Sequence, residues 1–181
     1  MLAILVVGDD AAQEFDDLVD RYERRIFNLI LRIVGDYDEA ADLTQDTFLA
    51  AYKAFDGFRS QAAPYTWLYR IAINVCKNRF REKKKWQEVE IESADEAVSI
   101  PESATPEAVL QQKELKGLIE DAILRLPEDY RIVVVLKEMH SLTYKEIAET
   151  TDTSEDVVKT RLARARNMLR QKLAPYLSQE K

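Results

Sequence analysis

Apolar residues recur at steps of three and four near the start of the chain, and this period constrains the fold more than any other feature. The series is Phe15, Leu18, Tyr22, Ile26, Leu29 and Ile33. This spacing puts the side chains on one face of an amphipathic helix, and Gly35 is a residue type that commonly ends one. The 181 residues include only 4 Gly and 5 Pro. The sequence therefore predicts an all-α protein.

Two further helices are expected in the first half. One starts near Asp36 to Asp38, where aspartate side chains can cap it, and Gly57 closes it. The apolar face of this helix consists of Ala41, Thr44, Phe48, Ala51, Tyr52 and Phe55. The next follows the FRSQAAP loop and carries the stretch PYTWLYRIAINVCKNRFREKKK, Pro64 to Lys85. Its predicted buried face consists of Leu68, Ile71, Ala72 and Val75.

The stretch from Pro64 to Lys85 changes along its length from aromatic to basic. Successive helical residues turn by about 100°, so Tyr65, Trp67 and Tyr69 cannot all face inward. Bases stack on aromatic rings while lysine and arginine hold phosphates, so the pattern suits single-stranded DNA. The alternative is that the aromatics belong to the core and the basic run is a solvated helix end. The basic residues are Lys77, Arg79, Arg81, Lys83, Lys84 and Lys85.

The net charge of −7 comes from one segment, Trp86 to Glu107, which holds seven acidic residues and no Lys or Arg. Elsewhere 26 acidic residues balance 26 basic ones, so the acidity does not argue against nucleic-acid binding. The segment contains Pro101 and Pro106 and lacks a sustained helical period. It reads as a flexible acidic linker between two small helical domains, 1–85 and 108–181. It is either a solvated spacer or a segment that lies in a basic channel of a partner.

The second domain is expected to end in a helix-turn-helix. A helix from Ala108 to Leu126 precedes Pro127 and the apolar run Ile132 to Met139. Thr143 and Glu146 have capping-box spacing, which starts a short helix over Tyr144 to Thr150. Asp152 and Thr153 form a brief turn, and Ser154 caps a longer basic helix. The apolar face of that helix consists of Val158, Leu162, Ala165, Leu169 and Leu173.

In a helix-turn-helix the second helix enters the major groove with its N-terminal half on the base edges. The expected contacts to base or backbone are Ser154, Glu155, Lys159, Thr160 and Arg161, with Arg164 and Arg166 better placed for phosphates. The alternative is a basic amphipathic helix that only solvates a bundle. The tight turn between two capped helices favours DNA binding.

Other classes of protein fit the sequence poorly. The single Cys76 cannot form an internal disulfide and fits a reducing cytoplasm. Together with the lone His140 it cannot make a usual zinc site, and we expect no cofactor or metal. No apolar run reaches the length of a membrane span. We find no convergent acid cluster, no Ser-His-Asp candidate and no phosphate-cradling Gly-rich loop, so an enzyme is not expected.

Taken together, four stretches resemble a bacterial RNA polymerase sigma factor. They are GDYDEAADLTQDTFLAAYKAFDGF, FRSQAAPYTWLYRIAINVCKNRFREKKK, LPEDYRIVVVLKEMHSLTYKEIAE and VKTRLARARNMLRQKL. Their order and spacing are similar to those of the small extracytoplasmic-function (ECF) class of the sigma-70 family. That class keeps only regions two and four, joined by a linker. The resemblance implies a promoter-specific initiation subunit without enzymatic activity of its own.

The resemblance also implies roles for matching residues here. The residues implied to contact the clamp helices of core RNA polymerase are Asp42, Leu43, Gln45, Asp46 and Phe48. The residues implied to read the −10 promoter element are Ser60, Gln61, Tyr65, Trp67, Tyr69, Arg70, Asn74, Lys77, Asn78 and Arg79. The helix-turn-helix would read the −35 element as duplex beside the polymerase flap, and the linker would run toward the RNA exit path. The resemblance further implies an anti-sigma partner and no insertion of this chain into a membrane.

One position departs from the family pattern. Members commonly carry Leu-Gly at the helix-turn-helix turn, whereas this chain has Thr151 and Asp152. Glycine permits a positive φ there, and aspartate tolerates that region better than most residues. Two readings without polymerase remain open on the residues alone. They are a repressor or activator that binds an operator as a dimer, and a helical adaptor that binds no DNA.

Overall fold

The computed structural model describes residues 9–55, 63–89 and 107–177. The described residues form helices joined by short turns and include no β-strand. The helices, in chain order, are α1 (Asp9–Val34), α2 (Tyr37–Ala54), α3 (Pro64–Val89), α4 (Glu107–Leu124), α5 (Glu128–Val134), the π-helical segment η2 (Val135–Met139), α6 (Tyr144–Thr151) and α7 (Glu155–Leu177). The all-α prediction is confirmed.

The first three helices pack around the apolar stripe of α1, as its period predicts. All six residues of the stripe are buried. Gly35 ends the helix with φ of 83°, the left-handed conformation that a side chain disfavours. Asp36 then caps α2, since its carboxylate accepts a hydrogen bond from the Glu39 amide at 2.7 Å.

The inward faces of α2 and α3 differ in detail from the predicted ones. Tyr52 is 48% exposed, although the period of α2 placed it on the apolar face. The residues that α2 buries are Ala40, Leu43, Thr44, Thr47 and Ala51. Thr44 and Thr47 can lie inside because their hydroxyls donate to backbone carbonyls four residues earlier. On α3, Leu68, Ala72, Ile73 and Cys76 are buried, whereas Ile71 and Val75 are half-buried.

Two predicted boundaries also shift. Helix α2 ends at Ala54, before Gly57. Helix α3 continues past Lys85 to Val89, and α4 begins at Glu107, so both helices extend into the segment predicted as a linker. The remainder of that segment, 90–106, lies outside the described residues.

The local signals of the helix-turn-helix are confirmed. Thr143 and Glu146 form a reciprocal capping box at the start of α6. Asp152 ends α6 with φ 54° and ψ 52°. This is the left-handed conformation that glycine commonly adopts at the end of a helix, and here aspartate adopts it. The Ser154 hydroxyl accepts a hydrogen bond from the Val157 amide at 3.3 Å and so caps α7. Val158, Leu162 and Ala165 bury the inner face of α7.

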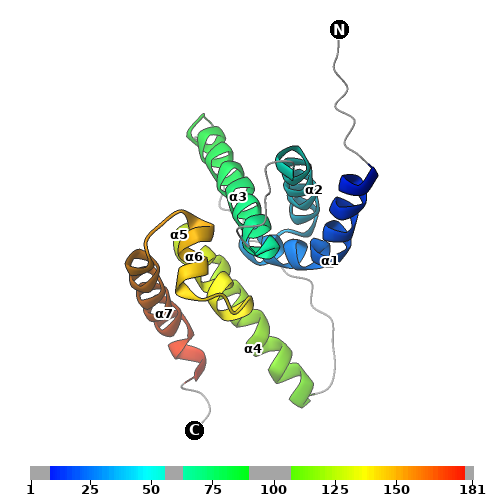
Figure 1. The fold of residues 1–181 in the computed structure, drawn as a ribbon. Coiled ribbons are helices and arrows are strands. Elements are labelled where there is room, and N and C mark those ends of the chain that lie inside the picture. The colour runs from blue at the N-terminus through cyan, green and yellow to red at the C-terminus, as the bar shows by residue number, and fades with distance from the viewer. Residues whose placement is uncertain (1–8, 56–62, 90–106, 178–181) are drawn as a thin grey trace.

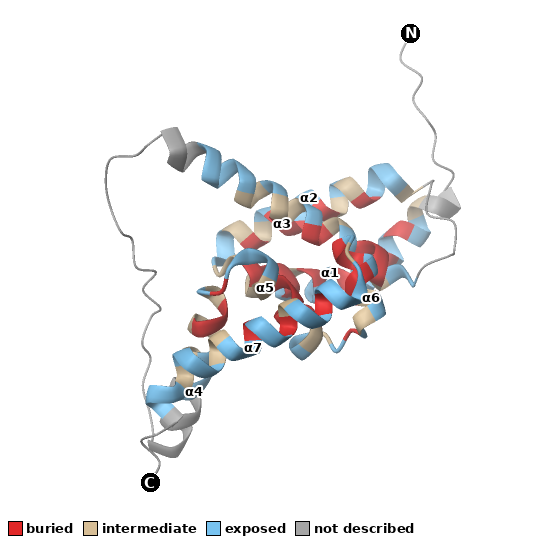
Figure 2. Ribbon diagram, turned by 90° about the vertical axis from the view of Figure 1, so that its left-hand side faces the viewer, coloured by how far each residue is buried: buried red, intermediate tan, exposed pale blue. Residues whose placement is uncertain are grey.

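The two halves of the chain pack against each other and share one continuous hydrophobic core. Helix α3 lies between α2 on one side and the α5–α6 region on the other (Figure 1). The buried positions concentrate where α1, α3, α5 and α6 meet, and exposed positions dominate the outer end of α3 (Figure 2). The sequence predicted two domains but gave no indication that they would join in this way.

Gly35 lies at this junction and gives a test of it. A Cβ at Gly35 would come within 2.8 Å of the Leu124 side chain on α4, in addition to the strain of a positive φ. We expect Gly35→Ala to lower the free energy of unfolding by about 1–3 kcal/mol. Gly117→Ala is the matched control, because a Cβ there meets nothing within 4 Å. Removing a helical glycine should raise stability by about 0.5–1 kcal/mol. Urea denaturation would measure both, and equal effects would contradict the assigned contact.

Candidate nucleic-acid and polymerase interface

The residues predicted to read single-stranded DNA divide into exposed and covered groups. Arg70, Asn74 and Asn78 are exposed along one side of α3. Ser60 and Gln61 lie outside the described residues. The remaining predicted residues, the three aromatics and two of the basic side chains, contact other parts of the molecule.

The aromatic residues of α3 are the clearest departure from the predicted open surface. Trp67 is only 8% exposed and packs near Phe55, with ring centroids 6.5 Å apart. Because Phe55 belongs to the same half of the chain, Trp67 acts here as a core residue. Tyr69 is also buried, and its hydroxyl lies 2.9 Å from Nδ1 of His140. Tyr65 is half-buried, and its hydroxyl donates a hydrogen bond to the Glu146 carboxylate.

The two tyrosines therefore contact the helix-turn-helix half through polar groups. The hydrogen bond from Tyr65 lowers the pKa of Glu146, and the capping box at Thr143 lowers it further. The same hydrogen bond raises the pKa of Tyr65. Burial raises the pKa of Tyr69. Both tyrosines thus stay protonated and can donate to their partners.

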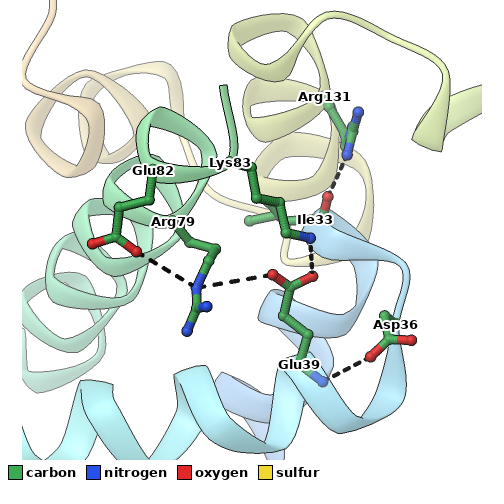
Figure 3. A network of polar contacts seen from close by, with 7 residues as sticks. All are labelled: Ile33, Asp36, Glu39, Arg79, Glu82, Lys83 and Arg131. Atoms are coloured by element: carbon green, nitrogen blue, oxygen red, sulfur yellow. Dashed lines mark hydrogen bonds and ion pairs between the residues drawn. The ribbon is translucent and has the colours of Figure 1, made fainter. Parts of the chain in front are cut away.

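The basic half of α3 is partly neutralised by α2 and α6. Lys77 donates to the carbonyl of Thr151 at the C-terminal end of α6, at 3.5 Å. Arg79 lies 3.9 Å from Glu39 of α2, and Lys83 lies 2.7 Å from the same carboxylate (Figure 3). Exposed cations for phosphates nevertheless remain on this helix, at Arg81, Lys84 and Lys85.

The predicted polymerase-docking face of α2 is only partly accessible. Asp42, Gln45 and Asp46 are exposed, and Phe48 is half-buried. Leu43 is 1% exposed and lies beneath this face in the structure, and its role in docking stays a prediction.

One exposed apolar residue on the same side of α2 was not among the residues predicted from the sequence. Leu49 is 58% exposed. Its position three residues after Asp46 and four after Gln45 puts it on the same side of the helix. A large apolar residue in register with the polar face was the signal that could have identified it.

Helix α7 presents most of its predicted duplex-reading residues to solvent. Ser154, Glu155, Thr160 and Arg164 are exposed. Lys159 is also exposed and pairs with Asp156 at 3.2 Å, within its own helix.

Two arginines of α7 are ion-paired with the same half of the chain. Arg161 pairs with Asp129 of α5 and Arg166 with Glu138 of η2, both at 2.6 Å. The Glu138 hydrogen bond raises the pKa of Arg166. Both arginines would have to exchange these partners for phosphate or base atoms.

Two family models match the two halves of the chain. Sigma-70 region 2 matches residues 18–86, and Sigma-70 region 4 matches residues 116–169. The RNA polymerase sigma-H factor of Pseudomonas aeruginosa is 36% identical over 94% of this chain and 90% of its own length. The ECF RNA polymerase sigma-E factor of Escherichia coli K12 is 35% identical over 94% of this chain and 91% of its own. The chain belongs to the ECF class of sigma-70 family sigma factors.

Solved structures have the same arrangement of helices as this sigma factor. The sigma factor RpoE of Bartonella quintana, solved with the anti-sigma factor NepR, matches with a TM-score of 0.73 at 22% identity. The match covers 90% of this chain and 98% of the RpoE chain. CnrH, solved with the cytosolic domain of CnrY, matches with a TM-score of 0.63 at 23% identity, over 94% of this chain and 91% of its own. These likenesses concern the fold.

Neither a metal site nor a membrane-spanning helix is found in the part of the chain that the structure describes. No His, Cys, Asp and Glu side chains there form a group of three or more that could hold a metal ion. None of the described helices has the length and apolar character needed to cross a membrane. Cys76 is fully buried, and burial raises the pKa of its thiol to about 12, so it is inert as a nucleophile.

His140 is one of the titratable groups at the junction between regions 2 and 4. Burial lowers its pKa to about 4, and the positive charges of Arg25 and Arg32 contribute. The neutral ring can accept the Tyr69 proton at Nδ1, whereas a protonated ring has no free lone pair there. The charged or titratable groups around it come from α1, α3 and α4; they are Arg25, Arg32, Tyr69, Lys116 and Glu120.

The depressed pKa of His140 predicts a pH dependence of stability. A group with a native pKa of about 4 and an ordinary value of 6.5 stabilises the fold fully above pH 6.5. That contribution is lost as the pH falls through 4. His140→Gln keeps a hydrogen-bond acceptor but does not titrate. In urea denaturation, we expect the difference in the free energy of unfolding between wild type and His140→Gln to shrink as the pH falls from 6.5 through about 4. A difference independent of pH would show that His140 is not held neutral.

Proposed function

We propose that the chain binds core RNA polymerase and directs promoter-specific transcription initiation. Region 2 would read the −10 element as a single strand, and region 4 would read the −35 element as duplex. The observation that carries this proposal is one chain holding both an aromatic and basic α3 and a helix-turn-helix whose α7 presents exposed polar residues at its N-terminal end.

Energetics argue that the chain acts with polymerase and not alone. Base stacking in duplex DNA is worth roughly 1.4 kcal/mol per step, so opening several pairs costs several kcal/mol. Stacking one base on an aromatic side chain returns about 1–3 kcal/mol. One helix can therefore capture a strand as it opens but cannot hold a bubble by itself. Core polymerase would supply the other contacts and the catalysis, so this subunit is not an enzyme.

The exposed face of α2 supports docking on the polymerase clamp helices. Asp42, Gln45 and Asp46 offer polar contacts, and Leu49 adds an apolar one at the centre of a protein interface. Region 4 would lie near the polymerase flap over the −35 element. Work on promoter DNA with core polymerase would place the protein in the cytoplasm.

An anti-sigma protein is a further proposed partner. The similar RpoE structure contains one, NepR. A partner of this kind would prevent transcription by covering the surfaces that bind polymerase. Adding it to a reconstituted reaction should abolish the starts that depend on this chain.

Run-off transcription tests the proposed function directly. Core RNA polymerase from the source bacterium would be assayed with and without this chain on a genomic fragment library, followed by sequencing of RNA starts. We expect new starts that share upstream elements. An active core that gives no new starts with folded protein would overturn the proposal and leave a stand-alone DNA binder as the leading function.

The predicted phosphate contact at Arg164 can be separated from base reading. Arg164 is exposed on α7. We expect Arg164→Ala in holoenzyme to weaken binding to all promoter variants alike and to reduce the slope of log K against log salt by about 1. Arg24→Ala, at an exposed position on α1, is the matched control and should change neither quantity. Altered discrimination between −35 variants would instead assign Arg164 to base reading.

A further inference from the structure

A cavity of about 750 Å³ opens between α1, α4 and the connection from η2 to α6. Its wall includes Arg25 and Arg32 of α1, Lys116, Ile119 and Glu120 of α4, and Met139 of η2. Cavities of this size hold small molecules in many proteins. Of the residues predicted to contact DNA or polymerase, Tyr69 alone lines it. The proposed function therefore leaves this cavity without a role.

One part of the cavity wall is apolar although it is open to water. Leu115 and Ile119 lie one turn apart on α4, and Met139 ends η2. These three side chains are between 37% and 41% exposed. Leu31 of α1 is half-buried and lines the same cavity. Large apolar side chains gathered in a hollow are typical of sites that take an apolar ligand group.

Basic side chains outnumber acidic ones around the same cavity. The described lining holds Arg25, Arg32 and Lys116 but one acid, Glu120. That carboxylate forms an ion pair with Arg32 and lies 4.0 Å from Lys116. It is therefore already engaged, and the exposed Arg25 retains its charge for a ligand. A guanidinium binds carboxylate, sulfonate and phosphate groups through charge-assisted hydrogen bonds, so the cavity favours an anion.

The backbone beside the cavity departs from regular helical geometry. The π-helical segment η2 ends at Met139, and Ser141 has φ of 57°, a left-handed conformation that is uncommon for serine. The Lys137 amine donates to the Leu142 carbonyl at 3.0 Å and so holds this turn. The turn brings Met139, His140 and Ser141 together on the cavity wall. Both π-helical turns and left-handed non-glycine residues are frequent at functional sites.

We propose that this cavity binds a small amphipathic anion, a molecule with an apolar body and one carboxylate, sulfonate or phosphate head group. The apolar body would pack on Leu115, Ile119 and Met139, and the head group would lie at Arg25. Binding involves neither DNA nor polymerase, so the site is a property of the chain beyond its proposed function. A ligand that binds only the folded chain also stabilises it by mass action.

Calorimetric titration of the full-length chain with decanoate, kept below its micelle concentration, tests the site. We expect saturable binding and a rise in the melting temperature with decanoate concentration. Acetate carries the same head group without the apolar body and should not bind measurably. Decyl phosphate distinguishes the two head groups, because the tighter ligand identifies the chemistry that the cavity prefers, and saturable binding of either supports the proposal.

Two variants at exposed positions assign the binding to this cavity. We expect Arg25→Gln to weaken decanoate binding about tenfold, because a charge-assisted hydrogen bond is lost. Arg24→Gln is its matched control, since Arg24 is exposed on the same helix but does not line the cavity. Ile119→Ser should also weaken binding several-fold. Leu49→Ser, which changes an exposed apolar residue of α2 outside the cavity, should leave binding unchanged.

Two results would overturn the proposal. One is that neither decanoate nor decyl phosphate binds to the folded chain. The other is binding that Arg25→Gln and Ile119→Ser weaken no more than Arg24→Gln and Leu49→Ser do, which would show non-specific adsorption to apolar or basic surface. Circular dichroism of each variant would verify that its helices are retained before the affinities are compared.

Discussion

The packing of α3 against both halves of the chain is the constraint on which the rest of the structure depends. Its inner face completes the core of region 2 through Leu68, Ala72 and Ile73. Neighbouring positions on α3 contact the helix-turn-helix half, where Tyr65 and Lys77 bond to residues of α6 and Tyr69 bonds to His140 at the end of η2. A helix that carried aromatics for DNA alone would expose them to water. Here the second domain covers two of the three, Tyr65 and Tyr69, and so limits the exposure of these rings to water.

The sequence predicts local structure well because the relevant interactions span a few residues. The period of α1, the Asp36 cap, the capping box at Thr143 and the Ser154 cap all depend on neighbours within one turn. The left-handed Asp152 was also foreseeable, since a turn between two capped helices needs one residue with positive φ. These same signals led from the sequence to the family.

The accessibility of the candidate site was less predictable. Leu43 and Trp67 were assigned to partner surfaces, yet both are buried, because which flank of a helix faces the core depends on packing with distant segments. The hydrogen bond of Tyr69 joins residues 71 positions apart, and that of Arg131 to Ile33 joins residues 98 apart. No periodicity in a short window encodes such pairs. For the same reason the junction between the halves appears only in the three-dimensional structure.

The proposed function requires Tyr65 and Tyr69 to leave their partners on the helix-turn-helix half when the chain binds core polymerase, and an intramolecular distance tests this requirement most directly. Cysteines placed at the exposed Arg24 of α1 and Gln171 of α7 would carry a fluorescent donor and acceptor, while the buried Cys76 stays unlabelled. We predict efficient energy transfer in the free protein and a large drop on adding core RNA polymerase. Transfer that stays unchanged in a transcriptionally active holoenzyme, or that is already low in the free chain, would contradict the account.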